Sequence, residues 1–116
     1  MNYGKLIPEI VGMYEKHGWQ LRRILLRPET RASFGAAVAF AKTTNVEDAA
    51  VDALWFSRAS SGGRDAWELR LLSENPFALF ETFEENETEE EREEMRREME
   101  ARLKDYIARS DDAPSE

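Results

Sequence analysis

The chain has 116 residues and an apolar content of 41%, which together suit a single folded domain rather than a disordered segment. It contains no cysteine, so disulfide bonds, a thiol nucleophile and a zinc–thiolate site are excluded. No apolar run approaches the roughly 18 residues of a membrane span, and the first residues lack the pattern of a signal peptide. The cytoplasm is therefore the simplest compartment.

The net charge of −8 is concentrated in one segment of the chain. Residues 81–100 hold eleven acidic and three basic side chains, while the rest of the chain is close to neutral. We expect this segment to repel nucleic acid and anionic membranes, so neither is predicted as a partner. It would attract a basic protein, and the plainer alternative is a solvated helix face that contributes only to solubility.

A helix is predicted over residues 5–17, because apolar side chains recur there at helical spacing. Pro8 fits its first turn, and Gly18 fits the position just after its end. His17, the only histidine of the chain, falls in the last turn, where a cation suits the helix dipole. We therefore assign His17 a capping role rather than a catalytic one.

The segment that follows, residues 19–28, predicts a strand because large apolar side chains fill it and a proline ends it, with a helix as the lesser alternative. A short helix is favoured over residues 28–35, between a proline and a glycine. The apolar run 36–42 is compatible with either a strand or a helix. Residues 43–49 are predicted to form a loop.

Three further segments, residues 51–59, 65–73 and 77–83, alternate in polarity and predict a three-stranded antiparallel meander. In the first of them Leu54 and Phe56 share one face. Together with the earlier strand, the meander completes a four-stranded antiparallel sheet.

Gly62 and Gly63 lie between Arg58 and Arg64, which raises the question of a phosphate-binding loop. A P-loop requires a lysine followed by serine or threonine at the start of a helix, and a dinucleotide fingerprint requires three spaced glycines. Neither pattern is present, so we interpret the segment as a hairpin. The turn is either Ser61-Gly62 or Gly62-Gly63, because both two-residue turns bring the apolar side chains of the two strands to the same face.

Trp55 is the leading candidate for a binding surface, because it lies on the strand face opposite to Leu54 and Phe56. Arg70 and Leu72 are expected beside it, and exposed clusters of aromatic and arginine side chains are favoured at binding surfaces. This interpretation holds if helices cover only the other face. The alternative is that residues 29–50 cover Trp55. The candidate binding residues are Trp55, Arg70, Leu72, Arg58 and Arg64.

The acidic segment enters a helix predicted over residues 88–109. Thr88 followed by Glu91 matches a capping box at its start. Residues 84–94 contain no apolar side chain, so this part is expected to project beyond the core or to lie over it fully solvated. The helix is supported by an apolar stripe of Met95, Met99, Leu103, Tyr106 and Ile107, and by the pairs Glu93–Arg97, Glu98–Arg102 and Glu100–Lys104.

The spacing of the polar residues indicates no catalytic or metal-binding constellation. No serine is matched to a base as in a triad, no metal motif containing histidine occurs, and carboxylates on a helix diverge instead of surrounding calcium. Asp52 is a minor candidate for acid–base work, because apolar residues surround it in the sequence. We predict neither a cofactor nor a metal.

The sequence therefore predicts an α+β two-layer sandwich in the order α-β-excursion-β-β-β-α. The four-stranded antiparallel sheet carries the N- and C-terminal helices on one face. Residues 1–109 form the single domain, and residues 110–116 form a disordered tail.

The leading functional hypothesis is a small acidic cytoplasmic binding protein without catalytic activity. Its sheet face and its acidic helix would meet a protein partner that is basic or partly unfolded. One alternative is a small-molecule-binding domain or enzyme with a pocket between the sheet and the helices. Another is a homodimer formed through an edge or a face of the sheet.

Overall fold

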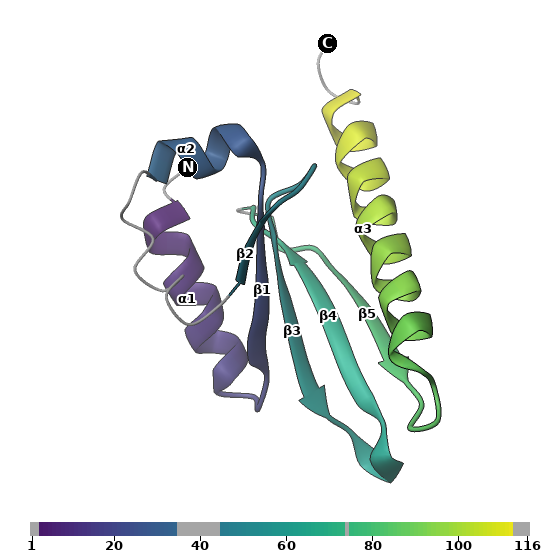
Figure 1. Ribbon diagram of the computed structural model, residues 1–116. Coiled ribbons are helices and arrows are strands. Elements are labelled where there is room, and N and C mark those ends of the chain that lie inside the picture. Colours follow the sequence, from purple (N-terminus) through teal and green to yellow (C-terminus); the bar gives the residue numbers. More distant parts are fainter. Residues whose placement is uncertain (1–2, 35–44, 74, 113–116) are drawn as a thin grey trace.

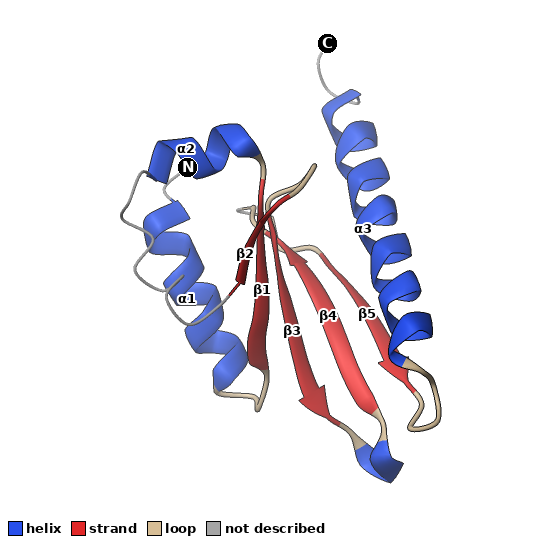
Figure 2. Ribbon diagram, in the orientation of Figure 1, coloured by secondary structure: helices blue, strands red, loops and turns tan. Residues whose placement is uncertain are grey.

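The computed structural model describes residues 3–34, 45–73 and 75–112, so the apolar run 36–42 lies outside the described residues. The fold is α+β, as predicted, and Figure 2 shows its helices and strands. The elements are α1 (Tyr3–Glu15), β1 (Gln20–Leu26), α2 (Pro28–Phe34), β2 (Asn45–Asp48), β3 (Ala53–Ala59), the short turn η2 (Ser61–Gly63), β4 (Asp65–Leu71), β5 (Ala78–Phe83) and α3 (Glu89–Asp112).

The strands form one five-stranded sheet in the order β2-β1-β3-β4-β5. β1 and β2 are parallel, and the other neighbouring pairs are antiparallel. The prediction of a four-stranded, purely antiparallel sheet is therefore wrong. It lacks β2, because Val46 is the only apolar residue in this four-residue strand and such a segment has the polar composition of a loop.

The two long helices cover opposite faces of the sheet, α1 on one side and α3 on the other (Figure 1). The prediction that both lie on one face is wrong, and the protein has three layers. The reason is visible in β3, where Leu54 and Phe56 point to one face while Ala53 and Trp55 point to the other. A strand that is apolar on both faces requires a cover on both faces.

The core on the α1 side forms where Ile7 and Ile10 of the helix meet the sheet. Tyr14 of α1 stacks on Phe56, with 4.0 Å between the ring centroids. The helix begins at Tyr3 and ends at Glu15, so Pro8 lies inside it rather than in its first turn. The remaining buried residues of this core are Trp19, Ile24, Leu26, Leu54, Phe56, Ala66 and Leu72.

The turn that follows α1 is at Gly18, as predicted, although the helix ends at Glu15, two residues before its predicted end. Gly18 has a φ of 86°, a conformation that glycine adopts more readily than other residues. The Nδ1 atom of His17 lies 3.1 Å from the carbonyl oxygen of Met13. His17 therefore contacts the last turn of the helix, in agreement with the structural role assigned to it.

The core on the α3 side contains Met99 and Leu103 of the helix, packed on Leu25, Val51, Ala53, Trp55 and Leu69. The capping box at the start of α3 is confirmed. The Thr88 N–H donates to Glu91 Oε1 at 2.8 Å, and the Glu91 N–H donates to Thr88 Oγ1 at 3.1 Å. The helix continues to Asp112, past its predicted end at residue 109.

The first half of α3 lies closer to the sheet than predicted. Arg92 and Glu93 are half-buried, and Arg96 is only 1% exposed. The guanidinium carbon of Arg96 lies 4.4 Å from the centroid of the Trp67 ring and 5.8 Å from that of Phe83. Arginine stacked on aromatic rings thus replaces the missing apolar contacts, and the expectation that residues 84–94 are fully solvated is wrong.

The predicted hairpin between β3 and β4 is confirmed, but neither predicted register is observed. Leu54 lies opposite Arg70, and Trp55 lies opposite Leu69. Both predicted registers rested on the assumption that apolar side chains gather on one face only. Since both faces are buried, the sheet also accepts the intermediate register, which places Trp55 and Leu69 together on the α3 side.

The turn of this hairpin is held by the backbone rather than by the flanking arginines alone. The Ser60 N–H donates to the Arg64 carbonyl oxygen at 2.8 Å. Gly62 and Gly63 have φ angles of 70° and 76°, which explains the need for glycine at both positions.

Of the described helices, none is both long enough and apolar enough to cross a membrane.

Candidate functional site

The predicted binding residues do not form one surface. Trp55 is 0% exposed and lies under α3, where its Nε1 atom donates to Glu100 Oε2 at 2.9 Å. Leu72 is also buried, but it belongs to the core on the α1 side. Trp55 is therefore covered, as the alternative interpretation required, although by α3 rather than by residues 29–50. The exposed patch predicted around Trp55 and Leu72 does not exist.

The three predicted binding arginines are engaged within the protein. Arg70 is half-buried and donates to the carbonyl oxygen of Leu71. Arg58 donates to the carbonyl oxygen of His17 at 2.7 Å and lies 4.7 Å from the centroid of the Trp19 ring. Arg64 pairs with Glu84 at 3.2 Å. Arg58 and Arg64 thus connect neighbouring segments of the fold, whereas the bond of Arg70 stays within β4.

A half-buried polar pair, close to Arg70, lies between α1 and β4. The hydroxyl group of Tyr14 donates to the Glu68 carboxylate. Burial, followed by the hydrogen bond and the charge of Glu68, raises the pKa of Tyr14 above its ordinary value of 10.0. Tyr14 therefore remains protonated as a hydrogen-bond donor, and the pair attaches α1 to the sheet.

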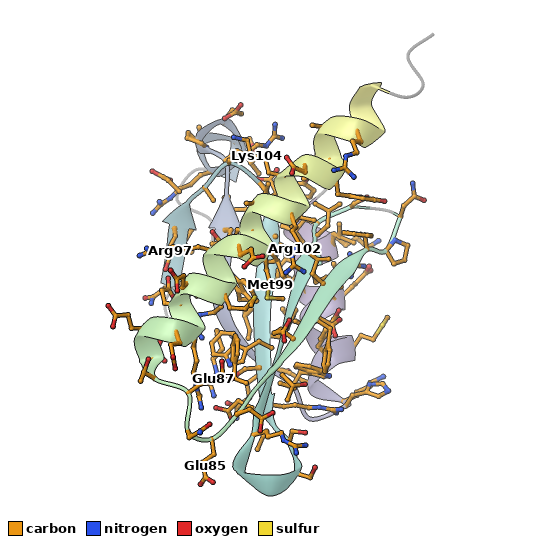
Figure 3. All side chains as sticks on the ribbon, turned by 90° about the vertical axis from the view of Figure 1, so that its right-hand side faces the viewer. Glu85, Glu87, Arg97, Met99, Arg102 and Lys104 are labelled. Atoms are coloured by element: carbon orange, nitrogen blue, oxygen red, sulfur yellow. The ribbon has the colours of Figure 1, made fainter. Side chains whose placement is uncertain are left out.

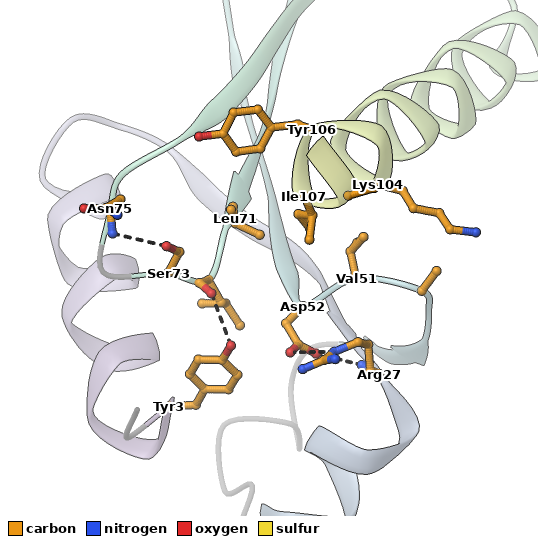
Figure 4. A pocket seen from close by; sticks show the side chains of 13 residues that line it. Tyr3, Arg27, Val51, Asp52, Leu71, Ser73, Asn75, Lys104, Tyr106 and Ile107 are labelled. Atoms are coloured by element: carbon orange, nitrogen blue, oxygen red, sulfur yellow. Dashed lines mark hydrogen bonds and ion pairs between the residues drawn. The ribbon is translucent and has the colours of Figure 1, made fainter. Parts of the chain in front are cut away.

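A cleft of about 600 Å³ opens at one end of the sheet, between the start of α1 and the last turns of α3. Figure 4 shows Tyr3 and Asp52 on one side of this cleft and Tyr106 and Ile107 on the other. The elements that meet here are far apart in the sequence, so of the lining residues the sequence indicates only Asp52 and Leu72 as candidates. The cleft is lined by Tyr3, Arg27, Ala50, Val51, Asp52, Leu71, Leu72, Ser73, Asn75, Lys104, Tyr106, Ile107 and Ala108.

Asp52 is the most buried ionisable group of the cleft, with 4% of its surface exposed. Its carboxylate accepts the Arg27 N–H at 2.8 Å, the Arg27 Nε–H at 3.1 Å and the Thr30 hydroxyl at 2.8 Å. These bonds tie the end of β1 and the start of α2 to the residue before β3. A carboxylate with partners on both oxygens is suited to holding the chain together rather than to proton transfer.

Tyr3 lies on the same side of the cleft as Asp52. Its hydroxyl group donates to the Leu72 carbonyl oxygen at 3.2 Å. Burial, and after it the negative charge of Asp52, raises the pKa of Tyr3 above its ordinary value of 10.0. The cleft therefore presents a neutral phenol, a paired Arg27 and the ring of Tyr106, which stacks on Phe77 at 3.6 Å between centroids. This arrangement can hold a ring and a polar group.

The second candidate surface is the outer side of α3, which crosses the sheet in the foreground of Figure 3. Residues spaced at 100° per residue along a helix project to defined sides. Met99 and Leu103 project toward the sheet, so an opposite group of carboxylates projects away from it. We call this group the acidic face; it consists of Glu90, Glu91, Glu94 and Glu98, all exposed.

Two of the basic side chains in the first half of α3, Arg92 and Arg96, are turned away from the acidic face, whereas Arg97 is exposed beside it. Arg92 pairs with Asp65 at 3.0 Å, and Arg96 lies against Trp67 while it pairs with Glu89 and with Glu93, the latter at 2.9 Å. Arg92 and Arg96 thus form their ion pairs away from the acidic face. On the acidic face itself, Glu98 pairs with Arg102 at 3.3 Å.

A depression of about 680 Å³ lies beside the acidic face. Glu93 is one of its walls. Burial disfavours the charged form of Glu93, but hydrogen bonds from Arg23 and Arg96 outweigh burial and lower the pKa of Glu93 below its usual 4.5. We call this hollow the acidic depression; it is lined by Arg23, Glu89, Glu90, Glu91, Glu93, Glu94 and Arg97. The sequence indicated its glutamates but not the contribution of Arg23 from β1.

The described part of the chain brings together no group of three histidine, cysteine, aspartate or glutamate side chains that could hold a metal ion. The divergence of the helical carboxylates accounts for this in the glutamate-rich segment.

Comparison of the chain with protein-family models, with curated proteins and with solved structures found no match. The candidate surfaces are therefore judged on their own chemistry.

Proposed function

We propose that this protein is a non-enzymatic binding protein that presents the acidic face of α3 to a basic protein partner. The observation that carries the proposal is the division of charge across the helix. Arg92 and Arg96 face the sheet, whereas Glu90 and Glu94 face outward. The outer side of the helix therefore carries more acidic than basic side chains, and Arg97 and Arg102 offset only part of the charge of the acidic face.

The shape of the surface supports the same partner. The acidic depression lies directly beside exposed carboxylates, and its volume of about 680 Å³ leaves room for a long basic side chain. Arg23 and Arg97 at its walls hold the carboxylate of Glu93, which lies 3.0 Å from Arg23 and 3.8 Å from Arg97. Complementary charge of this kind increases association rates and selects partners, and it weakens with salt.

The proposal is tested by the binding of a fluorescently labelled lysine-rich peptide, measured by anisotropy at several salt concentrations. We expect Glu90→Gln combined with Glu94→Gln to weaken binding roughly two- to thirtyfold at low salt, since exposed charge pairs contribute about 0.2–1 kcal/mol each. The affinity of the unmodified protein should fall steadily as salt is added.

The matched control is Glu9→Gln combined with Glu15→Gln on α1, which changes the net charge equally but at exposed sites away from α3. This control should bind the peptide almost as well as the unmodified protein. Equal weakening by both double variants would show that only net charge matters, and the assignment to the acidic face would be wrong.

The cleft supports a second candidate function, the binding of a small molecule that contains a ring and a hydrogen-bonding group. Tyr3, Tyr106 and Ile107 offer apolar surface, and Ser73 and Asn75 offer polar groups next to it. Concave sites with a few polar groups on an apolar lining are typical of small-molecule binding.

Benzoate and phenol are suitable probes, and their binding can be monitored through the backbone amide signals in NMR titrations. Shifts grouped at Tyr3, Leu72 and Tyr106 would support this function, and no grouped shift with either probe would remove it.

A further inference from the structure

The sheet has two edges, β2 and β5, and they differ in chemistry. β2 is short and carries Glu47 and Asp48, which pair with Arg23 and Arg31 at 4.0 and 3.0 Å. Charged side chains on a short edge strand are a common protection against pairing with another chain. β5 has the sequence Ala-Leu-Phe-Glu-Thr-Phe, with a single charge and no proline. It lacks the protection that β2 has.

Phe80, in the middle of β5, is the second most exposed large apolar side chain among the described residues, at 57%. It shares the α1 side of the sheet with Ala78 and Thr82, because its partner in β4 is Glu68. Its ring lies 6.2 Å from the centroid of Trp19, in an edge-on arrangement. One side of Phe80 therefore rests on the core, and the other side faces outward at the edge of the sheet.

The backbone groups that β5 presents at this edge follow from its pairing with β4. The Leu71 N–H donates to the Phe77 carbonyl oxygen at 2.9 Å. In an antiparallel ladder, residues that face the partner strand alternate with residues whose N–H and C=O point away. Ala78, Phe80 and Thr82 therefore direct their N–H and C=O groups outward, where no strand of the described residues pairs with them.

We propose that two copies of this chain associate through antiparallel pairing of β5 with β5, with Phe80 opposite Phe80 of the second copy. In this register Ala78 lies opposite Thr82 of the second copy, and Leu79 lies opposite Glu81. Every outward N–H and C=O of the strand then finds a partner. The two Phe80 rings lie side by side on the α1 side, where each already contacts Trp19.

The neighbouring registers are worse for specific reasons. A shift toward the end of the strand places Glu81 opposite Glu81 in a close pair, and like charges directly opposite each other are destabilising. A shift toward the start places Thr82 opposite Pro76, which has no N–H to donate. A register shifted by an odd number of residues would place residues whose N–H and C=O groups point outward opposite residues whose N–H and C=O groups already bond to β4. The symmetric pairing at Phe80 is therefore the best that this edge allows.

A second copy is also the partner that fits the rest of the sheet. Pairing around a two-fold axis uses β5 of both copies and leaves two β2 edges, which are the short and charged ones. The association is therefore closed and does not continue into fibres. The ten strands would form one continuous sheet, with both α1 helices on one face and both α3 helices on the other.

The first test is sedimentation of the full chain over a range of concentrations. We expect the mass to rise from 13.4 kDa toward twice that value as concentration increases. Thr82→Pro removes an outward N–H without touching the bonds to β4, so it should abolish the rise and leave the circular dichroism unchanged. If Thr82→Pro fails to fold, Phe80→Glu, which sets two carboxylates opposite each other, takes its place. A mass of 13.4 kDa at every concentration of the unmodified protein overturns the proposal.

The second test fixes the register by cross-linking, which is unambiguous because the chain has no cysteine of its own. In the proposed pairing, Phe80→Cys places two thiols on residues about 5.5 Å apart between Cα atoms, within the range of a disulfide. Thr82→Cys is the matched control on the same edge, with its two Cα atoms about 13 Å apart. Phe80→Cys should cross-link rapidly under mild oxidation and Thr82→Cys slowly. Equal rates for the two variants rule the pairing out.

Discussion

At the scale of single residues, Trp55 lies fully inside the protein because its one polar atom finds a partner there. The indole Nε1–H donates to Glu100 across the interface between β3 and α3, and the ring meets Trp67 edge-on at 5.8 Å between centroids. Asp52 is buried on the other side of the sheet for the same reason, since three hydrogen bonds donated to its carboxylate offset the loss of contact with water. Both residues were identified in the sequence as unusual, but as sites of function, whereas the structure uses them for stability.

Trp55→Ala should lower the free energy of unfolding by about 3–5 kcal/mol, because it leaves a cavity between the sheet and α3. Urea unfolding followed by circular dichroism measures this loss. Glu100→Leu should cost about 1–3 kcal/mol by leaving the indole N–H unpaired, whereas Glu100→Gln, which keeps an acceptor oxygen, should change stability much less. A small effect of Trp55→Ala would contradict the role of Trp55 in the core.

At the scale of elements, α3 combines two amphipathic patterns in one helix. From Met95 onward it meets the sheet through an ordinary apolar stripe, with Met99 and Leu103 buried. Its first turns, residues 89–94, have no apolar side chain, and Arg96 lies over Trp67 between Glu89 and Glu93. The capping box was readable in the sequence because it depends on residues three apart. The packing of Arg96 was not readable, because it depends on an aromatic ring in β4.

Arg96 and Arg97 provide a comparison of neighbouring arginines within this element. Arg96→Ala should lower the free energy of unfolding by about 3 kcal/mol, since it removes a buried charge that serves two glutamates and an aromatic face. Arg96→Lys should recover only part of this loss, because an ammonium group lacks the planar face of guanidinium. Arg97 is 77% exposed and lies 3.8 Å from Glu93.

Arg97→Ala is therefore the control, and its effect should stay below about 1 kcal/mol. Thermal or urea unfolding of the three variants measures the ranking. Similar losses for Arg96→Ala and Arg97→Ala would mean that the stacking on Trp67 contributes little, and that α3 is held mainly by Met99 and Leu103.

At the scale of the whole molecule, the division of the core into two separate clusters explains where surfaces remain for partners. α1 and α3 occupy opposite faces of the sheet, so the faces themselves are largely used. The outer side of α3, the cleft at the end of the sheet and the free edge of β5 are left. The proposed basic partner binds the outer side of α3, and the proposed second copy pairs with β5. Because the two surfaces differ, either proposal can be wrong without affecting the other.

The sequence by itself determined the local features: the two long helices, the capping box at Thr88, the glycine turn at Gly62 and Gly63, and the alternation of side chains along β3 and β4. Each of these depends on residues close together in the chain, and local backbone preferences are enough to select it. The sequence also located the negative charge, because composition does not depend on the fold.

Only the tertiary structure decided which surfaces are covered. Alternation along β3 shows that Leu54 and Trp55 point to different faces, but it does not say whether one or both faces carry a helix. The pairing of β2 with β1, the position of Arg96 over Trp67 and the burial of Asp52 all depend on contacts between distant segments. Burial is a property of the assembled layers, and for that reason Trp55 belongs to the core and Phe80 to the surface.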